Sequence, residues 1–199
     1  MGTRRHEQVA MNQPIARCWG DDDPLMAQYH DQEWGTPVHD DHLLYQHLVL
    51  DGFQAGLSWR TILHKREAFR RAFGGFNPEV VAGYGAAERE RLLADAGIVR
   101  NRQKIDAAIE NAKAMLKIQE ELGSFDDFLW QFTGGRTLRG RPVRDWRKLP
   151  TTSPQSDAMS AALKQRGFKF VGSTICYAFM QAVGMVDDHM QHCFRFQPR

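Results

Sequence analysis

Cysteine is scarce in this 199-residue chain, and long apolar runs are missing from it. Three cysteines are too few for the disulfide framework of a small secreted protein. The N-terminus lacks the apolar core of a signal peptide, and no apolar run approaches the roughly 20 residues that a membrane-spanning helix needs. We therefore expect a cytoplasmic protein without a membrane partner, built as one domain or as two small lobes that share a groove.

Positive charge is also scarce in the first quarter of the chain. Residues 1–50 hold three Arg and no Lys against eight Asp and Glu. The remaining residues hold 23 basic and 16 acidic side chains. This excess favours a polyanionic partner, although solubility alone also explains a surplus of this size.

Helical patterns dominate the chain after a non-periodic arm, residues 1–16, which we expect to be disordered. The run Asp21-Asp22-Asp23-Pro24 is typical of a helix N-terminus, and so are Ser58 and Asn77-Pro78. Leu43, Leu44, His47 and Leu48 predict one inward face, and Ile62, Phe69 and Phe73 predict another. Helices are expected at 40–50, after Ser58, after Asn77, and at 88–96, 102–122, 124–132, 153–166 and 171–183. No stretch alternates like a half-buried strand, so the predicted class is all-α.

One irregular stretch, residues 133–150, interrupts the helical pattern. It contains five Arg and one Lys between Arg136 and Lys148, together with several glycines and prolines. Two interpretations stay open: a solvated connection, or an arm that contacts phosphates.

Two Cys/His pairs predict a metal site. Cys18 and His30 have eleven residues between them, and His189 and Cys193 are separated by three, which predicts that both lie on one face of a helix. Two cysteines and two histidines complete a tetrahedral set, which structural Zn²⁺ favours and which leaves no open position for a reactive water. Each histidine alone is also explained as an ordinary polar residue. Cys176 lies in an apolar run and is expected to be a small buried side chain.

The segment from Leu92 to Ile105 predicts two helices joined by a tight turn at Gly97. Such a hairpin can present backbone N–H groups at the start of its second helix to a DNA phosphate. Arg100, Arg102 and Lys104 would add positive charge beside Gly97. A plain αα-hairpin without a ligand is the alternative interpretation.

Aromatic side chains and one carboxylate predict a pocket for a flat ring. Tyr29 and Trp34 flank the metal-ligand candidate His30, and Asp51 and Trp59 enclose a short segment with two glycines. A purine alkylated on a ring nitrogen is cationic, so aromatic faces would bind it by a cation–π interaction of roughly 0.5–2 kcal/mol. Such a base leaves its sugar as a neutral molecule, so a single carboxylate would suffice for its release.

Five motifs resemble the DNA-3-methyladenine glycosylase I family. They are Tyr29-His30-Asp31-x-Glu33-Trp34-Gly35, Gln54-Ala55-Gly56-Leu57-Ser58-Trp59, Ala96-Gly97-Ile98-Val99-Arg100, Arg166-Gly167-Phe168-Lys169-Phe170-Val171-Gly172 and Asp188-His189. The resemblance runs from about Arg17 to Cys193. It implies a helix-hairpin-helix DNA glycosylase fold, with two helical lobes around a base-binding pocket, in a single domain at 17–199 with the hairpin at about 88–113.

The resemblance also implies roles for individual residues. One structural zinc ion would be held by Cys18, His30, His189 and Cys193, tying the two ends of the chain together. Tyr29 and Asp51 would be the catalytic residues, with the base held by Trp59, Trp34 and Trp19. Asp51 departs from the family, whose members often carry glutamate there. Because the family lacks its superfamily's usual catalytic aspartate, Asp126 and Asp127 receive no role.

The function implied is excision of 3-methyladenine from double-stranded DNA by a monomeric, monofunctional glycosylase, which leaves an abasic site. Two rivals stay open. The shorter Asp51 is compatible with a protein that binds alkylated DNA without cutting it. A zinc hydrolase is the other rival, and it would need an open coordination position on the metal.

Overall fold

A computed structural model describes residues 15–198. The predicted disordered arm, residues 1–16, therefore lies almost wholly outside the described residues. Within the described part of the chain, nine α-helices form: α1 (Pro24–Gln32), α2 (Asp41–Gln54), α3 (Trp59–Ala72), α4 (Pro78–Ala82), α5 (Ala86–Ala94), α6 (Arg102–Leu122), α7 (Phe125–Trp130), α8 (Pro154–Gln165) and α9 (Ser173–Ala182).

Shorter elements connect these helices. Three are 3₁₀ turns, η1 (Gly74–Phe76), η2 (Gln131–Thr133) and η3 (Trp146–Lys148). Two are two-residue strands, β1 (Leu138–Arg139) and β2 (Val186–Asp187), which pair in parallel. The predicted all-α class is confirmed, and the strand pair is too short to leave a period-two pattern in the sequence.

Polar residues fix where the helices begin. The Asp23 carboxylate accepts hydrogen bonds from the backbone N–H groups of Leu25 and Met26, so α1 begins at the predicted Asp-Pro junction. Ser58 caps α3 and Asn77 caps α4, each through its side-chain oxygen. These local contacts orient α1 and α3, the two helices that carry aromatic residues toward the functional site.

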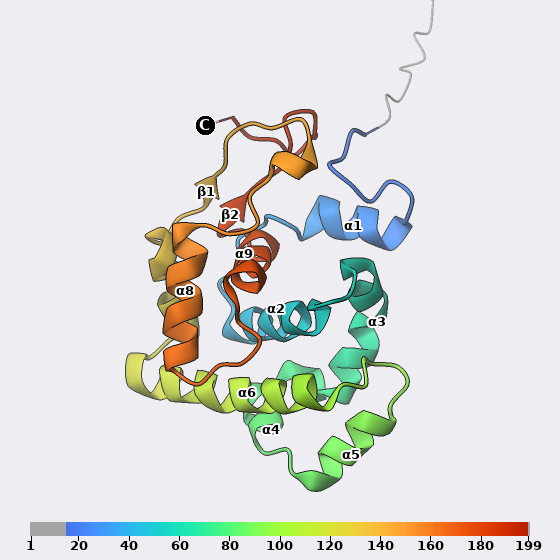
Figure 1. Cartoon of the computed structure of the whole chain (residues 1–199), viewed down its shortest axis with the longest axis vertical. Coiled ribbons are helices and arrows are strands. Elements are labelled where there is room, and N and C mark those ends of the chain that lie inside the picture. Colours follow the sequence, from blue (N-terminus) through green and yellow to red (C-terminus); the bar gives the residue numbers. More distant parts are fainter. Residues whose placement is uncertain (1–14, 199) are drawn as a thin grey trace, which may run out of the picture.

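Helix α2 lies at the centre of the molecule (Figure 1). It contacts α3, α6, α7 and α9, so most of its side chains are buried, among them Leu44, Tyr45, Leu48, Leu50 and Phe53. One prediction for this helix is wrong: Leu43 was expected to face inward and is 43% exposed. The helix also continues past the predicted end at Leu50 and so places Asp51 inside the protein.

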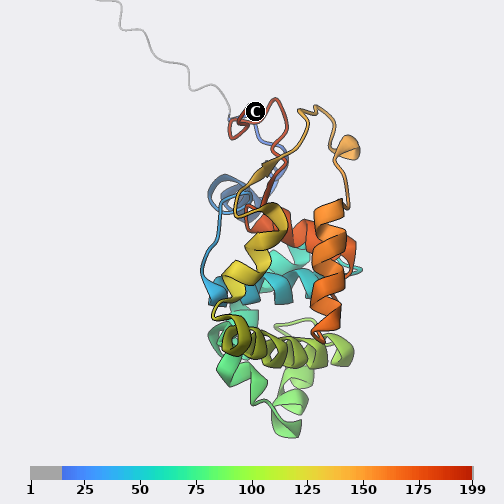
Figure 2. The same ribbon diagram turned by 90° about the vertical axis from the view of Figure 1, so that its left-hand side faces the viewer.

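The long helix α6 runs across one side of α2, and α4 and α5 lie on the far side of α6 (Figure 1). Helix α9 packs on α2 and α8 packs on α9. Figure 2 shows the resulting elongated shape, with α5 at one end and the terminal segments at the other. Among the helices described, none is long and apolar enough to cross a membrane.

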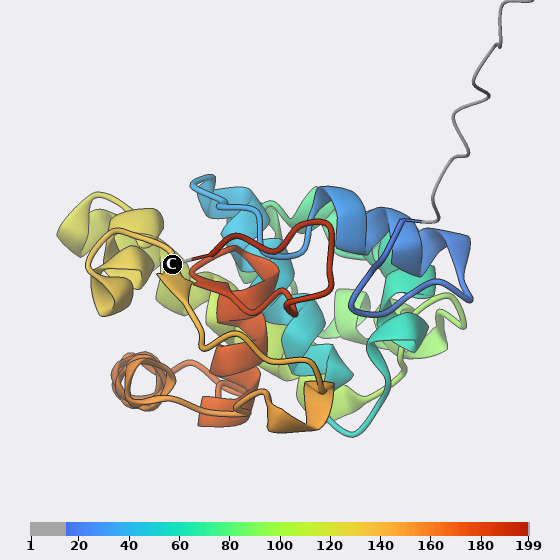
Figure 3. The same ribbon diagram turned by 90° about the horizontal axis from the view of Figure 1, so that it is seen from above.

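The two terminal segments lie side by side above α9 (Figure 3). The backbone N–H of Phe194 donates to the carbonyl oxygen of Ala16 at 2.9 Å, and that of Met190 donates to Cys18 Sγ at 3.1 Å. Strand β2 and the residues after it thus bring the end of the chain to the residues just before α1.

Candidate active site

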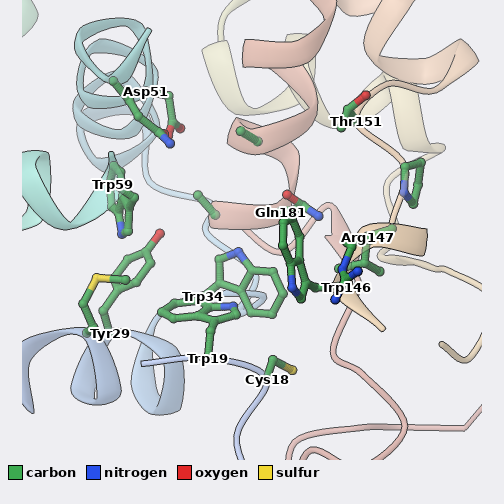
Figure 4. Close-up of a pocket in the computed structure, with 16 residues that line it drawn as sticks. Cys18, Trp19, Tyr29, Trp34, Asp51, Trp59, Trp146, Arg147, Thr151 and Gln181 are labelled. Carbon is green, nitrogen blue, oxygen red and sulfur yellow. The ribbon is translucent and has the colours of Figure 1, made fainter. Parts of the chain in front are cut away.

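A cavity of about 540 Å³ opens between the two walls shown in Figure 4. Tyr29, Asp51 and Trp59 form one wall, and Gln181, Trp146 and Arg147 lie across from them. Its volume falls within the range of about 300–1,000 Å³ that is usual for small-molecule sites. The cavity therefore has room for a flat ring together with the atoms attached to it.

Aromatic rings cover much of this cavity. Tyr29 projects from α1 and lies between Trp19 and Trp59, with ring centroids 6.0 and 5.1 Å away. Trp34 follows α1 and meets Trp19 edge to face at 5.3 Å. Figure 4 shows these rings gathered at one side of the cavity, so they present π-faces and ring edges to any ligand inside it.

Asp51 supplies a buried carboxyl group to the same cavity. It occupies the last turn of α2, is 2% exposed, and its buried Oδ2 atom has no hydrogen-bond partner. Burial raises the pKa of this carboxyl well above its usual value, because the charged form is poorly solvated there. The indole Nε1 of Trp59 is a second buried polar atom without a partner. A ligand that offers a donor to Asp51 and an acceptor to Trp59 would satisfy both atoms.

The hydroxyl of Tyr29 stays protonated beside Asp51. Burial raises the pKa of Tyr29 well above its usual value, and the nearby carboxylates of Asp51 and Glu33 raise it further. A neutral phenol can donate a hydrogen bond into the cavity. The five residues predicted to form the pocket thus all line one cavity: Trp19, Tyr29, Trp34, Asp51 and Trp59.

Gln181 is a cavity residue that the sequence analysis missed. Its amide nitrogen donates to Asp188 Oδ2 at 2.8 Å, and the Tyr177 hydroxyl donates to the same oxygen at 2.7 Å. Asp188 is 4% exposed and fixes the Gln181 side chain at the cavity wall. Its partner Asp188 belongs to one of the five motifs, but the sequence alone does not connect Gln181 with it.

A second cluster lies next to the cavity and has the donors of a metal site. The sulfur atoms of Cys18 and Cys193 and a nitrogen of His30 all lie within 4.8 Å of one another. The His189 ring lies 5.3 Å from the His30 ring, and its buried Nε2 has no hydrogen-bond partner. Two sulfur and two nitrogen donors suit a tetrahedral zinc ion, and an unpartnered buried Nε2 is what the fourth ligand would present.

Carboxylates orient both histidines of this cluster. His30 Nδ1 lies 2.9 Å from Asp31 Oδ1, and His189 Nδ1 lies 2.8 Å from Asp187 Oδ1. Metal-binding histidines usually carry such a partner on the nitrogen that does not bind the metal. The prediction that His189 and Cys193 share a helix face is wrong, because both lie in the irregular segment after β2. Their proximity comes from the fold of that segment and not from helical periodicity.

The four residues predicted to contact the DNA backbone do not all reach the surface. Arg100 and Arg102 are exposed between α5 and the start of α6, with Arg102 paired to Glu90 at 3.1 Å. The Gly97 N–H is already bonded to Asp95 Oδ1 at 2.7 Å.

Lys104 differs most from its prediction. It is 8% exposed, and its ammonium donates to the carbonyl oxygens of Phe53 and Ala55. Lys104 thus holds the end of α2 and the segment that leads to Trp59, because those carbonyls lack helical partners. The Lys104 ammonium is therefore bound inside the protein and does not extend into solvent.

Three other residues differ in whether they line the cavity. Asp126 pairs with His39 at 3.0 Å and lies outside the cavity lining, as does Asp127. Trp146, in contrast, lies in the basic stretch 133–150 and lines the cavity. Its position depends on the path of that stretch, which the sequence pattern does not specify.

Comparisons with known proteins show which family this chain resembles over most of its length. A sequence model of the methyladenine glycosylase family matches residues 19–196. DNA-3-methyladenine glycosylase 1 of Escherichia coli (strain K12) is 48% identical over 180 residues, which cover 90% of this chain and 96% of that protein.

Two solved structures have the same fold. A crystal structure of 3-methyladenine DNA glycosylase I matches 92% of this chain and 100% of its own, with 48% identity and a TM-score of 0.89. A structure of the Staphylococcus aureus 3-methyladenine DNA glycosylase I, described for its recognition of 3-methyladenine, is 38% identical with a TM-score of 0.84. It covers 88% of this chain and 93% of its own.

Proposed function

The chain belongs to the methyladenine glycosylase family, and from this premise we propose that it removes 3-methyladenine from alkylated double-stranded DNA. The reaction is hydrolysis of the N-glycosidic bond, and its products are the free base and an abasic site. The observation that carries the proposal is a cavity lined by the rings of Tyr29, Trp19 and Trp34 together with Asp51 and Trp59, each of which has a buried polar atom without a partner.

Recognition begins with rotation of the damaged nucleotide out of the duplex, since the bond to be cut is inaccessible in stacked DNA. The extruded base enters the aromatic cavity, where Trp59 stacks on it and Tyr29 positions it. Asp51 accepts hydrogen bonds from the exocyclic amine. A normal adenine has the same amine but lacks the positive charge, so it loses the cation–π interaction of roughly 0.5–2 kcal/mol.

The positive charge of the substrate also affects the protonation state of Asp51. Burial alone favours the protonated carboxyl, and a cationic base nearby favours the carboxylate. The methylated base thus restores the charge of Asp51, and the carboxylate stabilises the positive charge that develops as the glycosidic bond breaks. Water attacks the sugar carbon and gives up one proton to the solvent, while the electron pair of the broken C–N bond leaves with the base. The departing base is neutral, so no strong acid is needed.

We further propose one structural zinc ion at Cys18, His30, His189 and Cys193. Support comes from the clustered donors, the unpartnered His189 Nε2 and the carboxylates behind both histidines. When bound, zinc would cross-link the segment before α1 to the segment after β2 and so stabilise the wall that carries Trp19 and Trp34. With four protein ligands it has no place in the hydrolysis.

The remaining parts of the proposal concern how DNA is held. Residues 17–199 act as one glycosylase domain whose two helical lobes flank the cavity. The hairpin formed by α5 and α6 contacts the DNA backbone through Arg100 and Arg102, whose side chains are exposed there. Lys104 is not included among the DNA contacts, because its ammonium is buried. The protein is expected to work as a monomer in the cytoplasm.

Incubation of the purified protein with methylated duplex DNA tests the function. We expect free 3-methyladenine in the supernatant, measured by chromatography, and abasic sites in the DNA without strand cleavage. Strand cleavage at the abasic site would show a lyase activity that the site does not provide for. No release of 3-methyladenine would contradict the proposed function.

Binding of alkylated DNA without cleavage is the alternative, motivated by the shorter side chain of Asp51. The substitution Asp51→Glu separates the two, because it restores the length that family members often have. If the unaltered protein releases no base and Asp51→Glu does, the protein is a binder that has lost its activity. Release by the unaltered protein excludes this alternative.

A further inference from the structure

Trp146 stands out among the large apolar side chains of the described chain. It is 67% exposed, more than any other of them, and it nevertheless lines the cavity. An indole has an apolar ring and a polar N–H group, so an exposed indole at the opening of a pocket suits a contact surface. No residue of the wall formed by Tyr29, Asp51 and Trp59 is exposed to this degree.

The backbone around Trp146 is ordered by local bonds. The Asp145 carboxylate caps η3 by accepting a hydrogen bond from the Arg147 N–H at 3.1 Å. Leu149 and Pro150, which follow η3, also line the cavity. We call residues 145–150 the mouth segment. Figure 4 shows Trp146 and Arg147 across the cavity from Asp51 and Trp59.

The mouth segment belongs to a strongly basic part of the sequence. Between Arg136 and Lys148 the chain has six basic residues and one acidic residue, Asp145. Arg147 is 75% exposed, and its ion pair with Asp145 is long, at 3.5 Å. Exposed pairs of this kind contribute little, so the guanidinium is available to a stronger anion. The segment thus combines an aromatic face with cationic side chains, a combination that binds nucleic acid strands.

We propose that Trp146 and Arg147 bind the damaged DNA strand at the mouth of the cavity, with Trp146 stacking on a base beside the extruded nucleotide and Arg147 binding a phosphate. This inference rests on the proposed function, because the strand is brought to the mouth when its damaged base occupies the cavity. The buried end, at Tyr29 and Asp51, receives the base, and the exposed end meets the strand.

The test measures affinity for a duplex that carries a stable abasic-site analogue, at several salt concentrations. Trp146→Ala should weaken binding about tenfold, the loss expected for one stacked base. Its salt dependence should be unchanged, because no charge is removed. Arg147→Ala should weaken binding and lower the slope of log affinity against log salt by about 0.9, the value for one phosphate contact.

Two controls match these variants. Leu122→Ala removes another exposed apolar side chain, at the end of α6, and Lys113→Ala removes an exposed cation from the same helix. Both should bind the duplex like the unaltered protein. Trp146→Phe should retain most of the affinity, because an aromatic face remains.

Binding of a second ligand, free 3-methyladenine, shows whether the mouth segment contacts the DNA strand or the damaged base. Its binding should be the same in Trp146→Ala and in the unaltered protein. An equal loss for free base and duplex would place Trp146 in the base pocket and overturn the inference, as would unchanged duplex binding by both variants. Base release by the unaltered protein, measured in parallel, reports on the proposed function separately.

Discussion

Replacing Asp51 with asparagine is expected to slow release of 3-methyladenine about a hundredfold and to raise the stability of the folded protein at neutral pH. The rate falls because the neutral amide cannot stabilise the positive charge that develops on the sugar as the glycosidic bond breaks, a loss typical for one well-placed polar group. Stability rises because a buried carboxyl without a partner for Oδ2 is replaced by a neutral group of the same size.

The pH dependence of this gain follows from the raised pKa of Asp51. The folded protein holds a proton that the unfolded chain releases above about pH 4, so folding loses stability as the pH rises above that value. The gain from Asp51→Asn should therefore be present at pH 7 and absent below about pH 4. Thermal unfolding of both proteins across this range measures it.

Asp127→Asn is the matched control, since Asp127 is exposed at the start of α7 and outside the cavity. It should leave the rate of base release unchanged. Full activity in Asp51→Asn would show that the charge of Asp51 is not used. Lower stability in Asp51→Asn at pH 7 would show that the buried carboxylate has a favourable partner in the folded protein.

Removing a proposed zinc ligand is expected to lower the stability of the folded protein strongly. Cys18→Ala should lose the metal and lower the unfolding midpoint by about 10 °C, because a few kcal/mol of stability depend on the cross-link and each is worth about 2–4 °C at this size. Elemental analysis should find about one zinc per chain in the unaltered protein and none in the variant.

Cys176→Ala is the control, because Cys176 is buried in α9 and is not part of the cluster. It should keep its zinc. Below its unfolding temperature, Cys18→Ala should still release base, since the ion has no chemical role. Loss of chemistry with intact folding would instead favour a zinc hydrolase, and absence of zinc from the unaltered protein would contradict the proposed metal site.

Local signals made the helices predictable. A capping side chain satisfies backbone N–H groups within its own turn, so Asp23, Ser58 and Asn77 indicate helix starts without reference to the rest of the fold. Gly123 ends α6 with a left-handed conformation, φ 86°, which glycine adopts without strain. The range 102–122, predicted from periodicity and this glycine, is the range that α6 has.

Features that depend on distant contacts were not predictable in the same way. Lys104 has the sequence context of a DNA-binding cation, and its burial depends on the end of α2, some fifty residues earlier. The spacing of His189 and Cys193 fits a helix, but the segment after β2 is irregular. Trp146 reaches the cavity only because of the path that the chain takes between β1 and η3. Pattern and propensity do not encode such paths.

The cavity residues were predictable only in part. Tyr29, Asp51 and Trp59 could be grouped from the sequence because their motifs resemble a known family, not because their spacing requires a common pocket. Their positions on α1, α2 and α3 converge once those three helices pack. Gln181 escaped notice because its role is visible only through its bond to Asp188.

The central claim is that an aromatic cavity with one carboxylate distinguishes a cationic methylated purine from its normal counterpart. The most direct test compares base release from two duplexes of the same sequence, one with 3-methyladenine and one with adenine at the same position. We predict release of 3-methyladenine and no measurable release of adenine. Equal release from both duplexes, or release of adenine alone, would contradict the account.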